Sequence, residues 1–281
     1  NGLATGATTI QINSPWLTVA LLGKIPNIAS ITGFNRTGLG RLIFNATGYT
    51  GDFNATALGL PTALSLLSDG NGTMAPETLA LGNVVFDAGI VPNITVGRAG
   101  GTLPYGQASN KTIQAASISN LNLGLFVTNN NGYGLVVTDN FTADAGSLYS
   151  VSNAAFSVFT SGLTLSGKVS GTSGLTKVGN GTLVLGNATN DFSGDVNVTR
   201  GVLSISADGQ LGAAANKVVL NPTGGSPTLR VTDDLTFASG GQRADFDHLI
   251  GAYDSANGKM LEGWPRADVR LYVKIKAVPT P

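Results

Sequence analysis

The sequence contains no cysteine and only one histidine, His248. Without a thiol there can be no disulfide, no cysteine nucleophile and no thiolate zinc site, and a Ser–His–Asp triad would have to use His248. Charged residues make up 11% of the 281 residues, under half of the roughly 25% usual in soluble domains. The 16 basic residues only balance the 16 acidic ones, so no excess of cations is available to bind nucleic-acid phosphates.

Long apolar runs are also missing. The longest, Trp16 to Leu22, is too short to span a bilayer as a helix. Gly, Thr, Asn and Ser number 39, 30, 24 and 21, a composition that excludes helical bundles and coiled coils. Hydrophobic residues still reach 42% and the mean hydropathy is +0.19, which is enough to bury a core and argues against disorder. The length suits one large all-β domain with a small appendage.

Two segments of the chain repeat one pattern. Residues 35–44 (NRTGLGRLIF) match residues 176–185 (TKVGNGTLVL), and residues 49–52 (YTGD) match residues 192–195 (FSGD). The shared pattern is a basic residue, a Gly-x-Gly turn, alternating apolar residues, and then aromatic-hydroxyl-Gly-Asp. So many coincidences indicate two copies of one structural unit.

A shorter, constant period of 20 residues leads into the second copy and runs through it. It relates three pairs of apolar residues, Leu163 and Leu165, Leu183 and Leu185, and Leu203 and Ile205. Each pair is a two-residue alternation, which is typical of a strand with one buried face. Because one coil of a solenoid takes about 20 residues or more, the constant spacing predicts that each of these strands pairs with its equivalent in the next coil.

We therefore predict an all-β fold, a parallel β-helix (β-solenoid) with terminal strand and cap segments. The low charge agrees with this fold, because inward positions need aliphatic residues and turns need Gly, Asn and Asp. A β-sandwich is the alternative, since short, regularly spaced strands also suit it. We assign residues 32–240 to the solenoid, residues 1–31 to an N-terminal strand and cap segment, and residues 241–281 to a C-terminal cap and terminal strand.

Both ends contain strand-like segments, Thr8–Asn13 and Ala267–Ala277. A bare strand edge can accept a strand from another chain, and a head-to-tail contact that does not close propagates as a fibre. We expect either end to mediate self-assembly. The candidate assembly residues are Thr8, Thr9, Ile10, Gln11, Ile12, Val269, Leu271, Val273 and Ile275.

The repeats at residues 35–55 and 174–206 resemble the autotransporter-associated β-strand repeat of bacterial passenger domains. Residues 182–185 (TLVL) and 192–195 (FSGD) are the most specific parts of the match. The resemblance covers about a fifth of the chain directly. It implies a right-handed parallel β-helix that is displayed outside the cell, in which most copies of the repeat are structural.

Asn-x-Thr sequons are far more frequent than random placement predicts, and no Asn-x-Ser sequon occurs. A preference for Thr over Ser is what an N-glycosylating enzyme would select. The structural alternative is that Asn and Thr both suit solenoid turns and strands, and Asn180-Gly-Thr182 belongs to the repeat itself. The ten candidate glycosylation sites are Asn35, Asn45, Asn54, Asn71, Asn93, Asn110, Asn140, Asn180, Asn187 and Asn197.

The best candidates for catalysis are the acidic residues in Asp245–His248, with Asp233 and Asp234 nearby in sequence. Polysaccharide lyases and hydrolases use such carboxylates. These residues lie in a loop-rich end rather than on a repeating face, so a solvated cap with ion pairs is the favoured interpretation. We predict no catalytic residue and no enzyme activity.

Metal and phosphate sites are also not expected. Asp69–Asn71, and Asp254 with Asn257 and Glu262, lack the spacing of a calcium loop. The Gly-x-Gly turns precede strands rather than a helix N-terminus, so they offer no phosphate site. We predict no metal and no cofactor.

The function most consistent with these features is that of a secreted structural subunit of an extracellular or cell-surface filament, N-glycosylated and assembled from copies of itself. The alternative is a surface adhesin passenger that binds glycans or a host surface, and a polysaccharide lyase or hydrolase ranks third. The chain begins at Asn1 without Met, so we expect a processed, secreted product. We expect no nucleic-acid partner and no membrane span.

Overall fold

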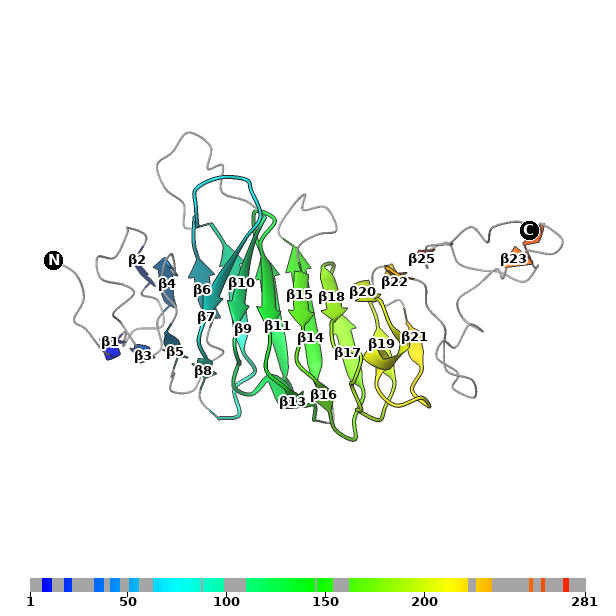
Figure 1. Ribbon diagram of the computed structural model, residues 1–281. Helices are drawn as coiled ribbons and strands as arrows, with labels where there is room; N and C mark the ends of the chain where they lie inside the picture. The colour runs from blue at the N-terminus through cyan, green and yellow to red at the C-terminus, as the bar shows by residue number, and fades with distance from the viewer. Residues whose placement is uncertain are drawn as a thin grey trace.

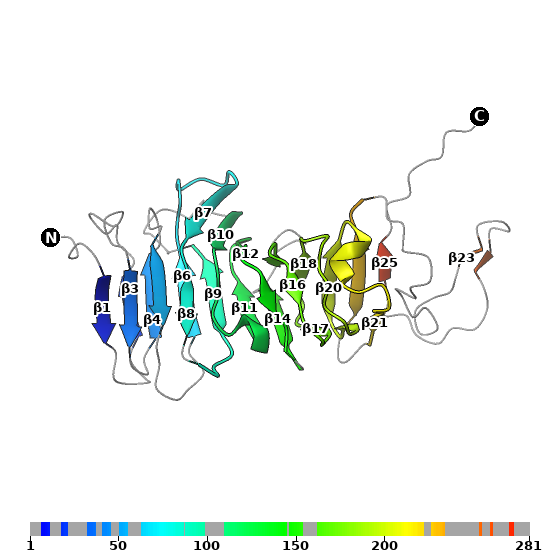
Figure 2. The same cartoon turned by 60° about the horizontal axis from the view of Figure 1, so that its bottom comes forward.

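The protein is a parallel β-helix in which successive coils stack along one axis (Figure 1). The computed structural model describes residues 51–52, 64–86, 88–98, 110–144, 146–152, 162–221 and 226–233, together with the backbone of strands at 7–11, 18–21, 33–37, 41–45, 53–55, 63, 153, 253–254, 259–260 and 270–272. Figure 2 shows the same stacking from a second side, with β1 at one end and β25 beyond β20 at the other.

Three parallel sheets, here called A, B and C, form the walls of the helix. Sheet A consists of β1 (Ala7–Gln11), β3 (Gly33–Thr37), β5 (Asp52–Ala55) and β8 (Val84–Phe86). Sheet B consists of β2 (Thr18–Leu21), β4 (Arg41–Asn45), β6 (Ala63–Leu67), β9 (Asn93–Gly97), β11 (Gly124–Asn129), β14 (Leu148–Asn153), β17 (Leu175–Val178), β19 (Val196–Val198) and β21 (Val218–Leu220). Sheet C consists of β7 (Glu77–Leu81), β10 (Lys111–Ala115), β12 (Gly134–Val137), β15 (Gly162–Leu165), β18 (Thr182–Leu185), β20 (Gly201–Ile205), β22 (Pro227–Val231) and β25 (Arg270–Tyr272).

Short elements complete the described coils. β13 (Phe141–Thr142) and β16 (Val169–Ser170) form a parallel pair, and β23 (Tyr253–Asp254) and β24 (Lys259–Met260) form an antiparallel pair. Two 3-10 turns, η2 (Leu121–Leu123) and η3 (Asp208–Leu211), lie between strands. The pairing within sheets A, B and C is parallel throughout, which matches the predicted β-helix and not a sandwich of antiparallel sheets.

The short period of the sequence is confirmed by the register of sheet C. Leu163 lies opposite Leu183, and Leu183 lies opposite Leu203. All three are fully buried, so identical residues stack on one another in the interior. Because stacked aliphatic side chains exclude water from both neighbours, each coil contributes to the burial of the next.

Coil length varies elsewhere. Leu79 lies opposite Ile113 and Leu135 lies opposite Leu163, so the coils that begin at Leu79 and at Leu135 are both longer than the one between Leu163 and Leu183. The longest of these coils contains three strands, β7, β8 and β9, whereas the coil that begins with β18 contains two, β18 and β19. The fixed quantity is therefore the register between coils and not the number of residues in each.

The two sequence copies form the same local structure on different walls. Residues 35–44 contribute to β3 and β4 in sheets A and B, and residues 176–185 contribute to β17 and β18 in sheets B and C. The final Asp has the same role in both copies: Asp52 Oδ1 accepts the backbone N–H of Asn83 at 2.8 Å, and Asp195 Oδ1 accepts that of Lys217 at 2.8 Å. In both copies this carboxylate ties a turn to the next coil.

The strands predicted near both ends of the chain are present. β1 pairs in parallel with β3 and β2 with β4, where β1 and β2 lie within residues 1–31, and β25 pairs in parallel with β22, where β25 lies within residues 241–281. These strands extend the same walls as the central coils, so the β-helix pairing continues into both segments that were assigned as caps.

Candidate functional site

The outward side of sheet C carries mostly small side chains, some of which, Thr182, Val202, Ser204 and Thr228, are buried. From β10 to β22 two rows of outward residues cross the strands, Thr112, Gly134, Gly162, Thr182, Val202 and Thr228 in one, and Gln114, Val136, Thr164, Val184, Ser204 and Arg230 in the other. Arg230 is the only charged residue at these twelve positions. The register adds a second arginine position, Arg270 of β25, opposite Thr228. Inward residues alternate with these rows and are buried.

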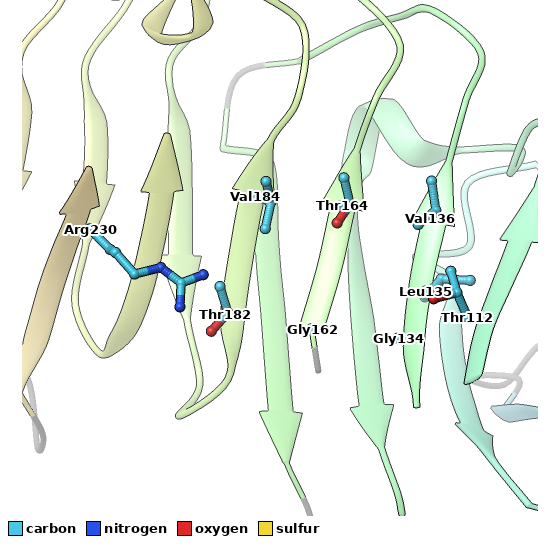
Figure 3. Close-up of a pocket in the computed structure, with 9 residues that line it drawn as sticks. All are labelled: Thr112, Gly134, Leu135, Val136, Gly162, Thr164, Thr182, Val184 and Arg230. Atoms are coloured by element: carbon cyan, nitrogen blue, oxygen red, sulfur yellow. The ribbon is translucent and has the colours of Figure 1, made fainter. Parts of the chain in front are cut away.

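A shallow hollow of about 80 Å³ lies on this face (Figure 3). It is lined by Thr112, Gly134, Leu135, Val136, Gly162, Thr164, Thr182, Val184 and Arg230. The hollow exists because Gly134 and Gly162 lie on adjacent strands and neither has a side chain. A Cβ on Gly162 would collide with the carbonyl oxygen of Thr182, whereas a Cβ on Gly134 would come no closer than 3.6 Å to any atom.

Arg230 lies at one end of the hollow. Its Nε donates a hydrogen bond to Ser204 Oγ at 3.1 Å, and in Figure 3 its guanidinium extends along the face toward Thr182. The parallel pairing of β20 with β22 sets this position, because it places Ser204 directly opposite Arg230.

The hollow is suited to surface contact and not to enclosing a substrate. Pockets that enclose a ligand usually measure about 300–1,000 Å³, well above this volume. Its polar groups are three threonine hydroxyls, which can donate and accept hydrogen bonds, and one guanidinium, which only donates. Such a set can bind one hydroxylated or acidic edge of a larger molecule.

Lys177 is the first of two lysines that are buried among the described residues, and it lies in β17. Its side chain is fully buried, and it occupies an inward row between Tyr149 and Val198. Its Nζ donates hydrogen bonds to the carbonyl oxygens of Val178 at 2.7 Å, Gly179 at 2.9 Å and Arg200 at 3.0 Å. Burial, with a smaller contribution from the charge of Arg200, lowers the pKa of Lys177 from 10.5 to about 7.

Lys111 is the second buried lysine and begins β10. Its Nζ donates to Asn71 Oδ1 at 2.6 Å and to the carbonyl oxygen of Ala75 at 2.6 Å, and it lies 3.5 Å from Glu77 Oε2. The turn over residues 69–77 therefore encloses an ammonium group. Across the described part of the chain, no cluster of three or more acidic or His residues could hold a metal.

The structure places seven of the ten sequon asparagines with their side chains. Asn71, Asn110, Asn140 and Asn180 are exposed, and Asn93, Asn187 and Asn197 are half-buried. At Asn71 and Asn187 the Thr hydroxyl two residues later donates to the asparagine Oδ1, at 2.8 and 2.6 Å. For Asn35, Asn45 and Asn54 the structure describes backbone only, in β3, β4 and β5.

The candidate assembly residues are described only in part. Thr8, Thr9, Ile10 and Gln11 lie in β1, opposite residues 34–37 of β3, and Leu271 lies in β25 opposite Leu229. Ile12, Val269, Val273 and Ile275 lie outside the described residues, as do Asp234 and Asp245–His248. The interpretation of this acidic segment as a solvated cap therefore stays a prediction from the sequence.

Comparison with known proteins locates the repeat. The family described as passenger-associated-transport-repeat matches residues 175–205. This segment is therefore similar to a passenger repeat. The adhesin BmaC autotransporter of Brucella suis biovar 1 (strain 1330) is 42% identical over 82 residues, which cover 29% of this chain and 2% of that protein. The chain therefore spans only a small part of that relative's length. No solved structure matches the chain significantly.

The passenger repeat corresponds to one coil and its junction with the next, from β17 through β20. Its alternating Leu183 and Leu185 face the interior, and its aromatic Phe192 is fully buried. The match confirms the resemblance that the sequence pattern predicted.

Three features of the site were not predicted from the sequence: the glycine hollow and the two buried lysines. One signal was present, because Lys177 follows Leu175 at a spacing of two and alternation alone places both on the inner face. The hollow had no such signal, since it depends on which glycines lie side by side across coils.

Proposed function

We propose that this chain is a non-enzymatic segment of an adhesin-type passenger that is displayed on the cell surface or released outside the cell. In this role the β-helix holds the outer face of sheet C in an extended, rigid array, and the hollow beside Arg230 binds a glycan or a host surface. The observation that carries the proposal is that the passenger repeat at residues 175–205 builds complete β-helix strands, β17 to β20, which continue into that face.

Further support comes from the chemistry of the surface. The residues that line the hollow supply hydroxyls, small apolar groups and one guanidinium, and the hollow is too small to enclose a substrate. The relation to an autotransporter adhesin also favours an extracellular location and a binding role over catalysis. No helix long and apolar enough to cross a membrane is found among the described residues.

The binding face can be tested by filling the hollow. Thr164→Arg and Val136→Arg place a long cation in it, and we expect each to reduce binding to an array of neutral and acidic glycans by at least tenfold. The matched control is Thr128→Arg, on the outward side of β11 in sheet B, which should leave binding unchanged. Equal binding by all three variants, or no glycan binding by the parent chain, would contradict the assigned face.

A subunit of a self-assembling filament is the second candidate. The edges of sheet B support this role. Among the described strands the sheet ends at β2 on one side and at β21 on the other, and each of these edge strands pairs in parallel with its neighbour. A second copy could therefore add to either end by the pairing used between coils. Electron microscopy of the undenatured chain should show fibres with a constant axial repeat, and deletion of residues 1–13 should abolish them while the core stays folded. Dispersed single rods would reject the filament.

N-glycosylation is proposed as a modification of either form. The exposed sequon asparagines and the Asx turns at Asn71 and Asn187 support it, because a glycan must be attached at an accessible carboxamide. Glycopeptide mass spectrometry of native material should find glycans on the exposed sites Asn110, Asn140 and Asn180. Unmodified peptides at all three would reject the modification.

A further inference from the structure

The turn over residues 69–77 brings an amine, a carboxamide and a carboxylate together. Lys111 Nζ lies 2.6 Å from Asn71 Oδ1 and 3.5 Å from Glu77 Oε2. Register places Lys111 directly opposite Glu77 on the neighbouring strand. The Lys111 side chain is fully buried, and that of Glu77 is 31% exposed. The amine is therefore held away from water against one acceptor carbonyl and one base.

The Asn71 carboxamide is polarised for nucleophilic attack. Besides Lys111, its Oδ1 accepts hydrogen bonds from the backbone N–H of Thr73 at 3.1 Å and from Thr73 Oγ1 at 2.8 Å. Donors that converge on a carbonyl oxygen stabilise the negative charge that develops there when a nucleophile adds to the carbon. Asn71 is exposed, so a small leaving group can escape into solvent.

Glu77 is placed to transfer the protons. Its Oε2 accepts the backbone N–H of Asn71 at 2.8 Å, which fixes the carboxylate beside the carboxamide. Gly70, with φ +50°, allows this arrangement, because a Cβ there would collide with Glu77 Oε2 and lie 3.4 Å from Lys111 Cε. The turn is thus shaped around the three groups.

We propose that Lys111 and Asn71 form an intramolecular isopeptide bond. Glu77 takes a proton from the Lys111 ammonium, and the freed amine attacks Asn71 Cγ. The carboxylic acid then protonates Asn71 Nδ2, and Glu77 takes a second proton from Nζ as the Cγ–Nδ2 bond breaks, which leaves the Cγ–Nζ amide. The released ammonia takes that proton from Glu77 and departs as ammonium. Overall, one ammonium side chain and one primary carboxamide are converted to one secondary amide and one ammonium ion. The reaction needs no oxidant or reductant.

The bond would tie the turn before β7 to β10 in the next coil. It also uses the carboxamide that a glycan on Asn71 would need, so Asn71 cannot carry both. Cross-linking and glycosylation at this sequon are therefore mutually exclusive.

The test is the intact mass of the full chain, produced in a host that lacks N-glycosylation. We expect a mass lower than that of the sequence by one ammonia molecule, and a branched tryptic peptide that joins Asn71 to an uncleaved Lys111. Lys111→Met, Asn71→Ala and Glu77→Gln should each restore the full mass. Asn71→Ala changes an exposed turn residue, so circular dichroism should show an unchanged β-helix in that variant.

Lys177→Met is the matched control, because it removes the other buried lysine, whose Nζ donates to the backbone carbonyls of Val178, Gly179 and Arg200. It should keep the mass deficit and the branched peptide. A full mass in the parent chain overturns the proposal. So does a deficit that persists in Lys111→Met, because Asn71-Gly72 would then have cyclised on its own backbone. A cross-link retained in Glu77→Gln overturns the role given to the carboxylate.

Discussion

At the scale of single residues, buried carboxamide side chains hydrogen-bond to the backbone of neighbouring coils at the corners, where the strands end. Asn190 Oδ1 accepts the N–H of Val169 at 2.8 Å, and its Nδ2 donates to the carbonyl of Gln210 at 2.8 Å. One side chain thus links its own turn to the coils before and after it. Because a carboxamide both donates and accepts, Asn can satisfy backbone groups wherever strands end, which explains much of the Asn content structurally.

Lys177 carries a pH-dependent part of the stability. Its pKa is lowered from 10.5 to about 7 in the folded chain, so between pH 7 and pH 10 the unfolded chain binds more protons than the folded one. The free energy of unfolding should therefore rise with pH in this window, by at most about 1.4 kcal/mol per pH unit. Below pH 7 both states are protonated and this contribution no longer changes with pH.

Urea denaturation at pH 7, 8 and 9 measures the slope. Lys177→Met should abolish it, and should lower stability at pH 9 more than at pH 7. Lys168→Met keeps Lys177 intact and should keep the slope of the parent chain. Burial raises the pKa of Tyr133 and Tyr149, so the test stays below pH 10, where tyrosines in the unfolded chain would begin to lose protons. Parallel slopes for the parent and Lys177→Met would contradict the prediction.

At the scale of elements, the distance between neighbouring strands decides which glycines are required. Gly162 begins β15 beside Thr182 of β18, and no Cβ fits between the two backbones. Gly134, on the adjacent strand, has room for one. The two glycines look equivalent in the sequence, since each precedes an apolar alternation, but they meet different neighbours.

Gly162→Ala and Gly134→Ala form a matched pair. We expect Gly162→Ala to lower the free energy of unfolding by roughly 1–3 kcal/mol, because the strands must move apart. Gly134→Ala should be neutral or stabilising by up to about 1 kcal/mol, because it fits and restricts the unfolded chain. Urea midpoints compare them, and equal losses in both variants would contradict the close approach seen at Gly162.

At the scale of the whole molecule, the β-helix is a linear stack in which each coil contacts mainly its neighbours. Position 182 lies opposite position 202, and position 183 lies opposite position 203. Removal of residues 183–202 therefore joins two equivalent points of successive coils. The remaining chain has the same walls and is one coil shorter.

This deletion should yield a folded, cooperatively unfolding protein with the parallel-β circular dichroism of the parent. Deletion of only residues 183–192 serves as the control, because it removes half a coil and shifts sheet C residues out of their wall. That shorter deletion should fail to fold, although it removes fewer residues. If the half-coil deletion were as stable as the full-coil deletion, register between coils would not govern the fold.

Much of the β-helix could be predicted from local pattern alone. The recurrence of Leu163, Leu183 and Leu203 indicated the register, because alternation with one constant period can bury one face only if equivalent strands stack. The repeat also identified Asp52 and Asp195 as equivalent, and each caps the next coil. These features follow from residues that are close in sequence or periodic.

The candidate sites required the tertiary structure. The hollow depends on Gly134 and Gly162 meeting across two coils, and coil length is not periodic there. Lys111 reaches Asn71 from the next coil for the same reason. The sequence by itself determined the all-β, stacked character of the protein, since burial of alternating aliphatic residues is local and repeated. Only the tertiary structure decided which polar residues meet, because loops of unequal length set which turn lies above which.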